Sequence, residues 1–209
     1  MERQDLSALV GRVLGLGDGG RVLLGIAGAP GSGKTTVAKR LVTALRREGV
    51  GAVRVPMDGF HLADETLRAR GTLDRKGAIE TFDAHGYLAL LRRLRAETEH
   101  DVFAPSFERS LDQPLAGAVT VAPGDRVVVT EGNYLLDETA PWDAVRAALD
   151  EVWFADLEES RRRSRLVDRH VAHGRSREAA QAWVEDVDEP NARRVIARRE
   201  AADLVLPSP

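Results

Sequence analysis

Residues 28–35 carry the most specific chemical pattern in the chain, GAPGSGKT, which stands between an apolar run and a helix-forming stretch. The glycines of this pattern let the backbone turn so that N–H groups point inward at phosphate oxygens. Lys34 supplies a mobile positive charge for the β- and γ-phosphates, and Thr35 offers a hydroxyl group to Mg²⁺. The following helix adds the partial positive charge of its N-terminus. The predicted nucleotide-binding residues of this loop are Gly28, Ala29, Pro30, Gly31, Ser32, Gly33, Lys34, Thr35 and Thr36.

This pattern predicts a bound nucleoside triphosphate, but kinases, ATPases and GTPases all use it. A GTPase usually contains an N-K-x-D motif for guanine, in which a lysine follows an asparagine. The chain has three lysines, Lys34, Lys39 and Lys76, and none of them follows an asparagine. The sequence therefore favours adenine over guanine and leaves the reaction open.

Two carboxylates stand where apolar runs end, Asp58 after VRVPM and Glu131 after VVVT. In parallel α/β sheets, ligands bind beyond the carboxyl ends of the strands. Phosphoryl transfer to an alcohol needs one carboxylate that accepts the hydroxyl proton and an acid that holds Mg²⁺. Asp58 fits the first role, whereas Glu131 together with Thr35 fits the metal side. The alternative is that each carboxylate caps a helix or is a solvated strand end.

A third group of candidates lies on a predicted helix over 157–173, where Arg161, Arg165 and Arg169 follow one another at intervals of four. Three like charges on one face repel each other unless something anionic meets them. We therefore predict that Arg165 and Arg169 close on the phosphates, with Arg175 near the tip of this segment. A solvated basic face is the alternative. The other face of the helix is expected to be marked by Leu157, Ser164, Val167 and Val171.

The elements that must position these residues alternate between strands and helices, which predicts an α/β fold with a parallel sheet. Strands are expected at 21–28, 52–58, 125–132, 151–156 and 202–207. Helices are expected at 5–15, 34–48, 83–97, 141–150, 157–173, 177–187 and 190–200. Residues 101–108 read as extended and 115–123 as a short strand without an assigned partner. The stretch from about 62 to 82 has no clear period and is expected to be an insertion over the sheet edge.

Length and composition limit the class of protein. The 209 residues carry 33 acidic and 30 basic side chains, which gives a net charge of −3 and disfavours a generally basic nucleic-acid binder. The chain has no cysteine, which excludes disulfides, cysteine-ligated metals and a thiol nucleophile. No run of 18 apolar residues is present, and Glu2 and Asp5 are unlike a secretory signal. We expect a cytoplasmic protein with a single domain over residues 1–209.

The ordered set GAPGSGKTT, MDGFH and VVVTEGNYLL resembles the P-loop kinase family that contains uridine kinase, phosphoribulokinase and type I pantothenate kinase. With PSFER and a late PNA, it looks most similar to the bacterial nucleoside/nucleotide kinase-like or fructose-transport-system kinase branch. The likeness covers about residues 20–206. It implies a three-layer αβα P-loop fold with a mostly parallel five-stranded sheet of order 2-3-1-4-5 and a helical lid over about 161–190. The resemblance also implies that Asp58 is the catalytic base and that Glu131 corresponds to the acidic residue of the family's EG motif. The family's lid motif is matched by Arg165, Leu166, Arg169 and Gly174.

The substrate side departs from uridine kinase, because Asp112 and Pro114 stand where that family has a histidine and an arginine. Arg109 instead suggests an anionic or polyhydroxylated acceptor, although a surface arginine paired with its neighbour is equally compatible. Insertions at about 59–82 and 101–122 are expected to form this side of the site. The predicted substrate residues are Asp58, His61, Arg109, Asn133 and Tyr134.

These patterns together predict a phosphotransferase that uses ATP and Mg²⁺ to phosphorylate an alcohol group of a small metabolite, such as a sugar, a nucleoside or a pantothenate-like compound. Its partners would be ATP and that acceptor, without nucleic acid or membrane, in a monomer or homodimer. A P-loop ATPase or nucleotide-dependent switch without an acceptor is the main alternative. A nucleic-acid protein using the arginine-rich C-terminal third is less favoured, because few aromatic residues interleave those arginines. The predicted catalytic residues are Lys34, Asp58, Glu131, Arg165 and Arg169.

Overall fold

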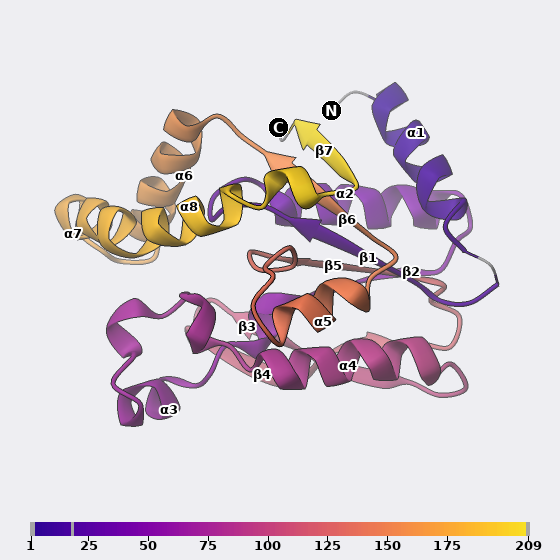
Figure 1. The fold of residues 1–209 in the computed structure, drawn as a ribbon, viewed down its shortest axis with the longest axis horizontal. Helices are drawn as coiled ribbons and strands as arrows, with labels where there is room; N and C mark the ends of the chain where they lie inside the picture. Colours follow the sequence, from indigo (N-terminus) through magenta and orange to yellow (C-terminus); the bar gives the residue numbers. More distant parts are fainter. Residues whose placement is uncertain (1–2, 18, 208–209) are drawn as a thin grey trace.

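The computed structural model describes residues 3–17 and 19–207. Its central sheet has the strand order β2-β5-β1-β6-β7, and every neighbouring pair is parallel (Figure 1). Counted along the chain, this is the expected order 2-3-1-4-5, so the predicted α/β fold and strand order are confirmed. The strands are β1 (Val22–Ala27), β2 (Ala52–Pro56), β5 (Val127–Gly132), β6 (Glu151–Asp156) and β7 (Leu204–Pro207).

Helices cover both faces of this sheet and form the outer two layers (Figure 1). Because successive side chains of a strand point to opposite faces, β1 places Leu23 in one core and Leu24 and Ile26 in the other. A fully buried leucine contributes about 1.5–3 kcal/mol relative to an exposed one, so both faces of β1 must be covered. One face packs against α1 (Arg3–Leu14) and α2 (Lys34–Arg47), and the other against α4 (Ala84–Ala96) and α5 (Trp142–Ala147).

A separate antiparallel hairpin joins β3 (Val102–Glu108) to β4 (Gln113–Val121). The two segments that the sequence identifies as extended therefore pair with each other rather than with the main sheet. The hairpin packs closely on the turn that follows β2, where a Cβ atom on Gly59 would lie 2.5 Å from the Pro105 carbonyl oxygen. Only glycine allows this approach, which fixes the hairpin beside Asp58.

The stretch without a clear sequence period is ordered as well. It contains a 3₁₀ turn at Met57–Phe60, the short helix α3 (Asp64–Ala69) and further 3₁₀ turns at Leu73–Arg75 and Ile79–Thr81. Residue Asp58 thus lies in a 3₁₀ turn, two residues beyond the end of β2, rather than at the last position of the strand. Short turns of this kind leave no periodic pattern that a sequence could reveal.

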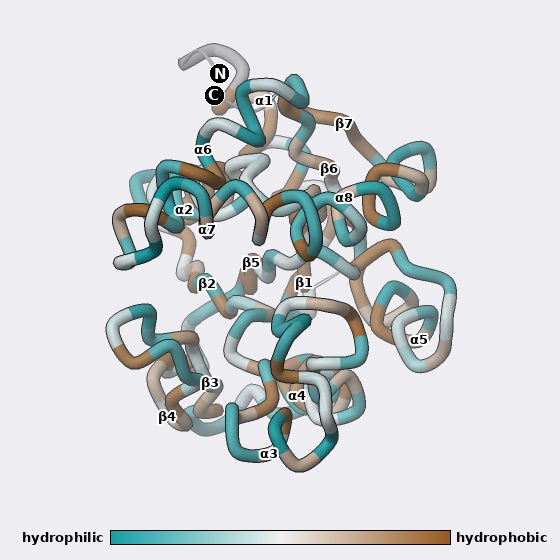
Figure 2. The backbone as a smooth tube through the Cα atoms, turned by 90° about the vertical axis from the view of Figure 1, so that its left-hand side faces the viewer, coloured by the Kyte–Doolittle hydropathy of each residue, from teal (hydrophilic) through white to brown (hydrophobic). Residues whose placement is uncertain are grey.

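The C-terminal helical segment, residues 159–196, differs from the expectation of separate helices at 177–187 and 190–200. Here α7 (Arg177–Trp183) continues through a π-helical stretch, Val184–Asp188, directly into α8 (Glu189–Ile196). In α6 (Glu159–Ala172) the buried residues are Arg162 and Leu166, whereas Val171 is exposed, so the expected apolar face is wrong. Figure 2 shows this segment on one side of the molecule and α3, α4 and the hairpin on the other.

Candidate active site

The loop between β1 and α2 is shaped by glycines in left-handed backbone conformations. Gly28 has a φ of 155°, Gly31 of 80° and Gly33 of 93°. A Cβ atom on Gly28 would lie 2.6 Å from the Ser32 hydroxyl oxygen, so the loop closes tightly on itself. The Ser32 N–H donates to the Ala29 carbonyl at 3.0 Å, which completes this turn. The result is the compact nest of backbone groups that phosphate binding requires.

Lys34 begins α2 and its amine reaches across to the end of β5. The Nζ atom donates to Asn133 Oδ1 at 2.8 Å and to the Ala29 carbonyl at 3.2 Å. Burial lowers the pKa of Lys34, and Arg169 adds to this effect, while the carboxylates of Glu131 and Asp58 oppose it. Oxygen atoms of Asn133 and Ala29 therefore hold the ammonium group in the site, and an anionic ligand would add further oxygen contacts.

Glu131 is almost fully buried at 2% exposure and pairs with two side chains from neighbouring elements. Its Oε1 accepts from the Thr35 hydroxyl at 3.2 Å and from Arg54 Nη1 at 2.8 Å. Burial raises the pKa of Glu131 and the nearby Asp58 carboxylate raises it further, against the opposing effects of Lys34 and Arg54. The ion pair with Arg54 was not predicted, because nothing in the sequence of a buried strand indicates which neighbour an outward arginine will meet.

His61 lies beside Asp58 and is enclosed by aromatic rings. Its centroid is 4.1 Å from that of Phe82 and 4.9 Å from that of Phe107. Burial lowers the pKa of His61, although the nearby Asp58 acts in the opposite direction, so the neutral imidazole is favoured. The Nδ1 atom lies 2.8 Å from the Asp58 carbonyl oxygen. A carbonyl can only accept, so Nδ1 carries the proton and Nε2 is left as an acceptor.

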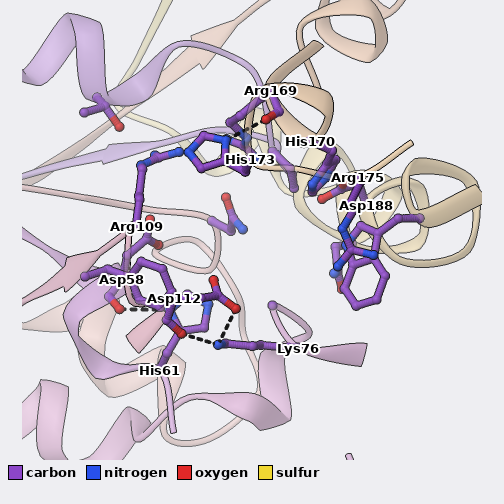
Figure 3. Close-up of a pocket in the computed structure, with 18 of the residues that line it drawn as sticks. Asp58, His61, Lys76, Arg109, Asp112, Arg169, His170, His173, Arg175 and Asp188 are labelled. Carbon is purple, nitrogen blue, oxygen red and sulfur yellow. Dashed lines mark hydrogen bonds and ion pairs between the residues drawn. The ribbon is translucent and has the colours of Figure 1, made fainter. Parts of the chain in front are cut away.

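The phosphate loop lies at a cavity of about 620 Å³ (Figure 3). The insertion after β2 and the hairpin form one wall of this cavity, and the C-terminal helical segment forms the opposite wall. Arg109 is drawn beside Asp58 and extends toward the side on which Arg169 and His173 lie. Most predicted site residues meet at this cavity. Those that line it are Pro30, Gly31, Lys34, Thr35, Asp58, His61, Arg109, Glu131, Asn133, Arg169 and Arg175.

The remaining predicted residues of the phosphate loop, Gly28, Ala29, Ser32, Gly33 and Thr36, are not among the described residues that line the cavity. Outside this loop, two predicted residues lie elsewhere. Tyr134 is 1% exposed in an aromatic cluster with Phe82 and Trp142, and its hydroxyl donates to the Gly77 carbonyl at 2.7 Å. It supports the insertion behind the cavity wall rather than forming the wall. Arg165 is solvent-exposed on α6 and is not among the described residues that line the cavity.

Lys76 is a cavity residue that the sequence analysis did not identify. Its ammonium group contacts Asp64 Oδ1 at 2.7 Å and Asp112 Oδ2 at 2.9 Å, and lies 5.4 Å from the centroid of the Phe107 ring. Lys76 thereby ties the insertion after β2 to the tip of the hairpin. Its rarity was the available signal, since it is one of three lysines among 30 basic residues.

The opposite wall comes from the C-terminal helical segment. His170 Nε2 lies 2.8 Å from Asp188 Oδ2, and the Arg175 guanidinium stacks 4.0 Å from the centroid of Trp183. Burial lowers the pKa of Arg169; Asp188 opposes this, while Arg109 reinforces it. Arg169 and Arg109 line the cavity from opposite walls (Figure 3), and the repulsion between their charges favours an anion between them.

The residues present fit a nucleotide and Mg²⁺. Ser32 Oγ in the phosphate loop is buried without a hydrogen-bond partner among the described residues, which is unusual unless a ligand or water completes it. Thr35 and Glu131 supply the hard oxygen donors that Mg²⁺ prefers. No cluster of three or more His, Cys, Asp or Glu side chains suited to a metal occurs within residues 3–17 and 19–207. Over the same ranges no helix is long and apolar enough to cross a membrane.

One family model and several known proteins are similar to this chain. Residues 23–208 match the family model described as "Phosphoribulokinase / Uridine kinase family". The chain is 41% identical to the "putative fructose transport system kinase" of Silicibacter sp. TM1040, with a TM-score of 0.89 over 97% of this chain and 98% of that one. It is 36% identical over 160 residues to the "Putative uridine kinase C227.14" of Schizosaccharomyces pombe, covering 74% of this chain and 68% of that protein. It is 30% identical over 209 residues to the pantothenate kinase of Corynebacterium diphtheriae, covering 88% and 67% respectively.

Proposed function

Because the chain belongs to the phosphoribulokinase and uridine kinase family, we propose that it transfers the γ-phosphoryl group of ATP to a hydroxyl group of a small metabolite. The observation that carries this proposal is that Asp58 and Lys34 line one cavity although they come from different elements. Strand β5 separates β2 from β1, so the two residues are set about two strand spacings apart, roughly 10 Å. That separation leaves room for a phosphoryl group and a hydroxyl in line.

In this mechanism the Asp58 carboxylate accepts the proton of the attacking hydroxyl group. Lys34 and Arg169 stabilise the charge that develops on the transferred phosphoryl group. Thr35 and Glu131 would hold Mg²⁺, which supplies neutralisation of the β- and γ-phosphate oxygens. Arg54 keeps the Glu131 carboxylate oriented toward Thr35 through its ion pair at 2.8 Å.

The acceptor is proposed to be polyhydroxylated or anionic, with sugars, sugar phosphates, nucleosides and pantothenate as the classes to test. His61 lines the cavity with Nε2 left as a hydrogen-bond acceptor, which would suit a hydroxyl donor. Arg109 carries a positive charge on the same wall, which suits a carboxylate or phosphate. Lys76 is less available, because Asp64 and Asp112 already contact it.

The test is a screen for ADP release with ATP, Mg²⁺ and members of these classes, run in parallel on Asp58→Asn. We expect one class to stimulate turnover, and we expect the variant to bind ATP normally while transfer falls by about 10²–10⁴. Calorimetry of ATP binding and single-turnover transfer on the same preparation separate the two effects. Turnover that is independent of every acceptor, and unchanged in Asp58→Asn, would instead indicate an ATPase or nucleotide-dependent switch.

A further inference from the structure

Arg162 is a charged residue in the first turn of α6 that lies almost completely inside the protein, at 1% exposure. Its Nη2 pairs with Glu189 Oε1 of α8, which is itself 6% exposed. Its Nη1 lies 3.4 Å from the carbonyl oxygen of Pro30, in the phosphate loop. The Nε atom has no hydrogen-bond partner among the described residues. One guanidinium therefore bridges the C-terminal helical segment and the back of the phosphate loop.

The contact with Pro30 matters because of the geometry of the peptide bond. In a planar trans peptide, the carbonyl of one residue and the N–H of the next point in opposite directions. Arg162 holds the Pro30 carbonyl toward α6, so the Gly31 N–H is directed the other way, toward the cavity that Gly31 lines. We propose that Arg162 is a positioning residue that orients the Pro30–Gly31 peptide for phosphate binding. This inference rests on the proposed function, since it assumes that the loop binds nucleotide phosphates.

Packing around Gly31 supports the same coupling. A Cβ atom on Gly31 would lie 2.8 Å from Leu166 Cγ and 2.9 Å from the Arg162 carbonyl oxygen, so α6 touches the loop backbone directly. A buried ion pair is weak evidence for stability, because the desolvation of both charges offsets their attraction. If α6 only had to pack against α8, an apolar pair would stabilise the contact without the cost of burying an unpaired Nε atom. Its second contact, to Pro30, gives the arginine a role that an apolar residue cannot fill.

The experiment compares Arg162→Met/Glu189→Met with the unmodified protein by calorimetry, using Mg²⁺-pyrophosphate and Mg²⁺-ADP as probes. The double variant fills the same space and keeps the net charge, so it should fold with a similar thermal midpoint. We expect affinity for both probes to fall by about tenfold, the effect of one lost orienting hydrogen bond in a buried site. Pyrophosphate is informative because it contacts the phosphate loop but has no base or ribose.

The matched variant is Glu189→Gln, which removes the charge of the pair but leaves Arg162 able to contact Pro30. It should bind pyrophosphate within about twofold of the unmodified protein, and Arg12→Met, which breaks a distant ion pair with Glu151, should do the same. Unchanged pyrophosphate affinity in the double variant, or an equal loss in Glu189→Gln, would overturn the positioning role. Lys34→Ala tests the premise separately: if it still binds pyrophosphate normally, the proposed function fails whatever Arg162 does.

Discussion

At the scale of single residues, several side chains of the site are held by a partner, and two of these partners are distant in sequence. Lys34 meets Asn133, Thr35 meets Glu131, and His61 is fixed by the backbone of Asp58. The sequence predicts the phosphate-loop residues and Asp58 because their types and spacing are specific to a chemistry. It does not predict their partners, since the contact between Arg54 and Glu131 depends on strand pairing and not on local pattern.

Arg169 and Arg165 provide a direct comparison on one helix. Arg169 lines the cavity, whereas Arg165 is exposed, so we expect Arg169→Ala to lower kcat by about a hundredfold with a smaller change in KM for the acceptor. Arg165→Ala tests the role that the sequence predicts for Arg165. If it lowers kcat as much as Arg169→Ala does, α6 must move when the nucleotide and the acceptor bind. Steady-state kinetics with the acceptor identified by the screen measure both, with the exposed Arg161→Ala as control.

The buried His61 should make folding stability depend on pH. Its pKa is lowered in the folded protein, so below about pH 6.5 the unfolded chain binds a proton that the folded protein does not. The free energy of unfolding should therefore fall as the pH is reduced from 7 to 5, with a contribution from His61 of at most about 1.4 kcal/mol per pH unit. Urea denaturation of His61→Asn should show a shallower pH dependence, and an identical slope would contradict the assignment.

At the scale of secondary-structure elements, buried strands were predictable and polar contacts between helices were not. An apolar run such as VLLGIA is stable only when it is buried between two layers, so the sequence identifies β1 as a buried strand. The buried face of α6 could not be predicted in this way, because an arginine is expected to be exposed to solvent unless its charge is paired. Arg162 nevertheless lies inward, where it contacts Glu189, 27 residues later in the chain, and the Pro30 carbonyl. The two segments of the hairpin were recognised, but their mutual pairing required the structure.

The contact between α6 and the phosphate loop predicts a strong effect of Gly31→Ala. Its φ of 80° strains any other residue, and the added Cβ would overlap Leu166 and the Arg162 backbone. Gly174 is the matched control, because its φ of 96° is similar but its Cβ would meet none of the described atoms within 4 Å. Denaturant unfolding should show a loss of about 1–2 kcal/mol for Gly174→Ala and a further 1–3 kcal/mol for Gly31→Ala. An equal loss of unfolding free energy in the two variants would mean that α6 moves away from the added methyl group without destabilising the fold.

At the scale of the whole molecule, the cavity is formed between parts that are distant in sequence. The insertion after β2 contributes His61 and Lys76, the hairpin contributes Arg109, and the C-terminal helical segment contributes Arg169 and Arg175. The resemblance to known kinases implied the sheet order, which the structure confirms. The tie made by Lys76 and the stack of Arg175 on Trp183 could not be foreseen, because each depends on how two irregular segments fold toward each other.

A ligand that bridges these parts should stabilise the molecule as a whole. At a concentration one hundred times its dissociation constant, Mg²⁺-ATP should add about 2.7 kcal/mol to the free energy of unfolding, which corresponds to about 5–10 °C in the thermal midpoint. Differential scanning fluorimetry should show this shift in the unmodified protein and in Asp58→Asn. The shift should disappear in Lys34→Ala or when Mg²⁺ is chelated. A full shift in Lys34→Ala would contradict nucleotide binding at the phosphate loop.

The π-helical stretch Val184–Asp188 sets the helical phase of everything that follows it. A π-helical turn accommodates one residue more than an α-helical turn, so each residue beyond it is rotated by about 100° relative to an unbroken α-helix. Asp188, at the end of this stretch, reaches His170, and Glu189, which follows it, reaches Arg162. If the same residues formed a regular α-helix instead, both carboxylates would be rotated away from their partners. The π-helical stretch thus rotates the end of one continuous helix so that it contacts two residues of α6, His170 and Arg162.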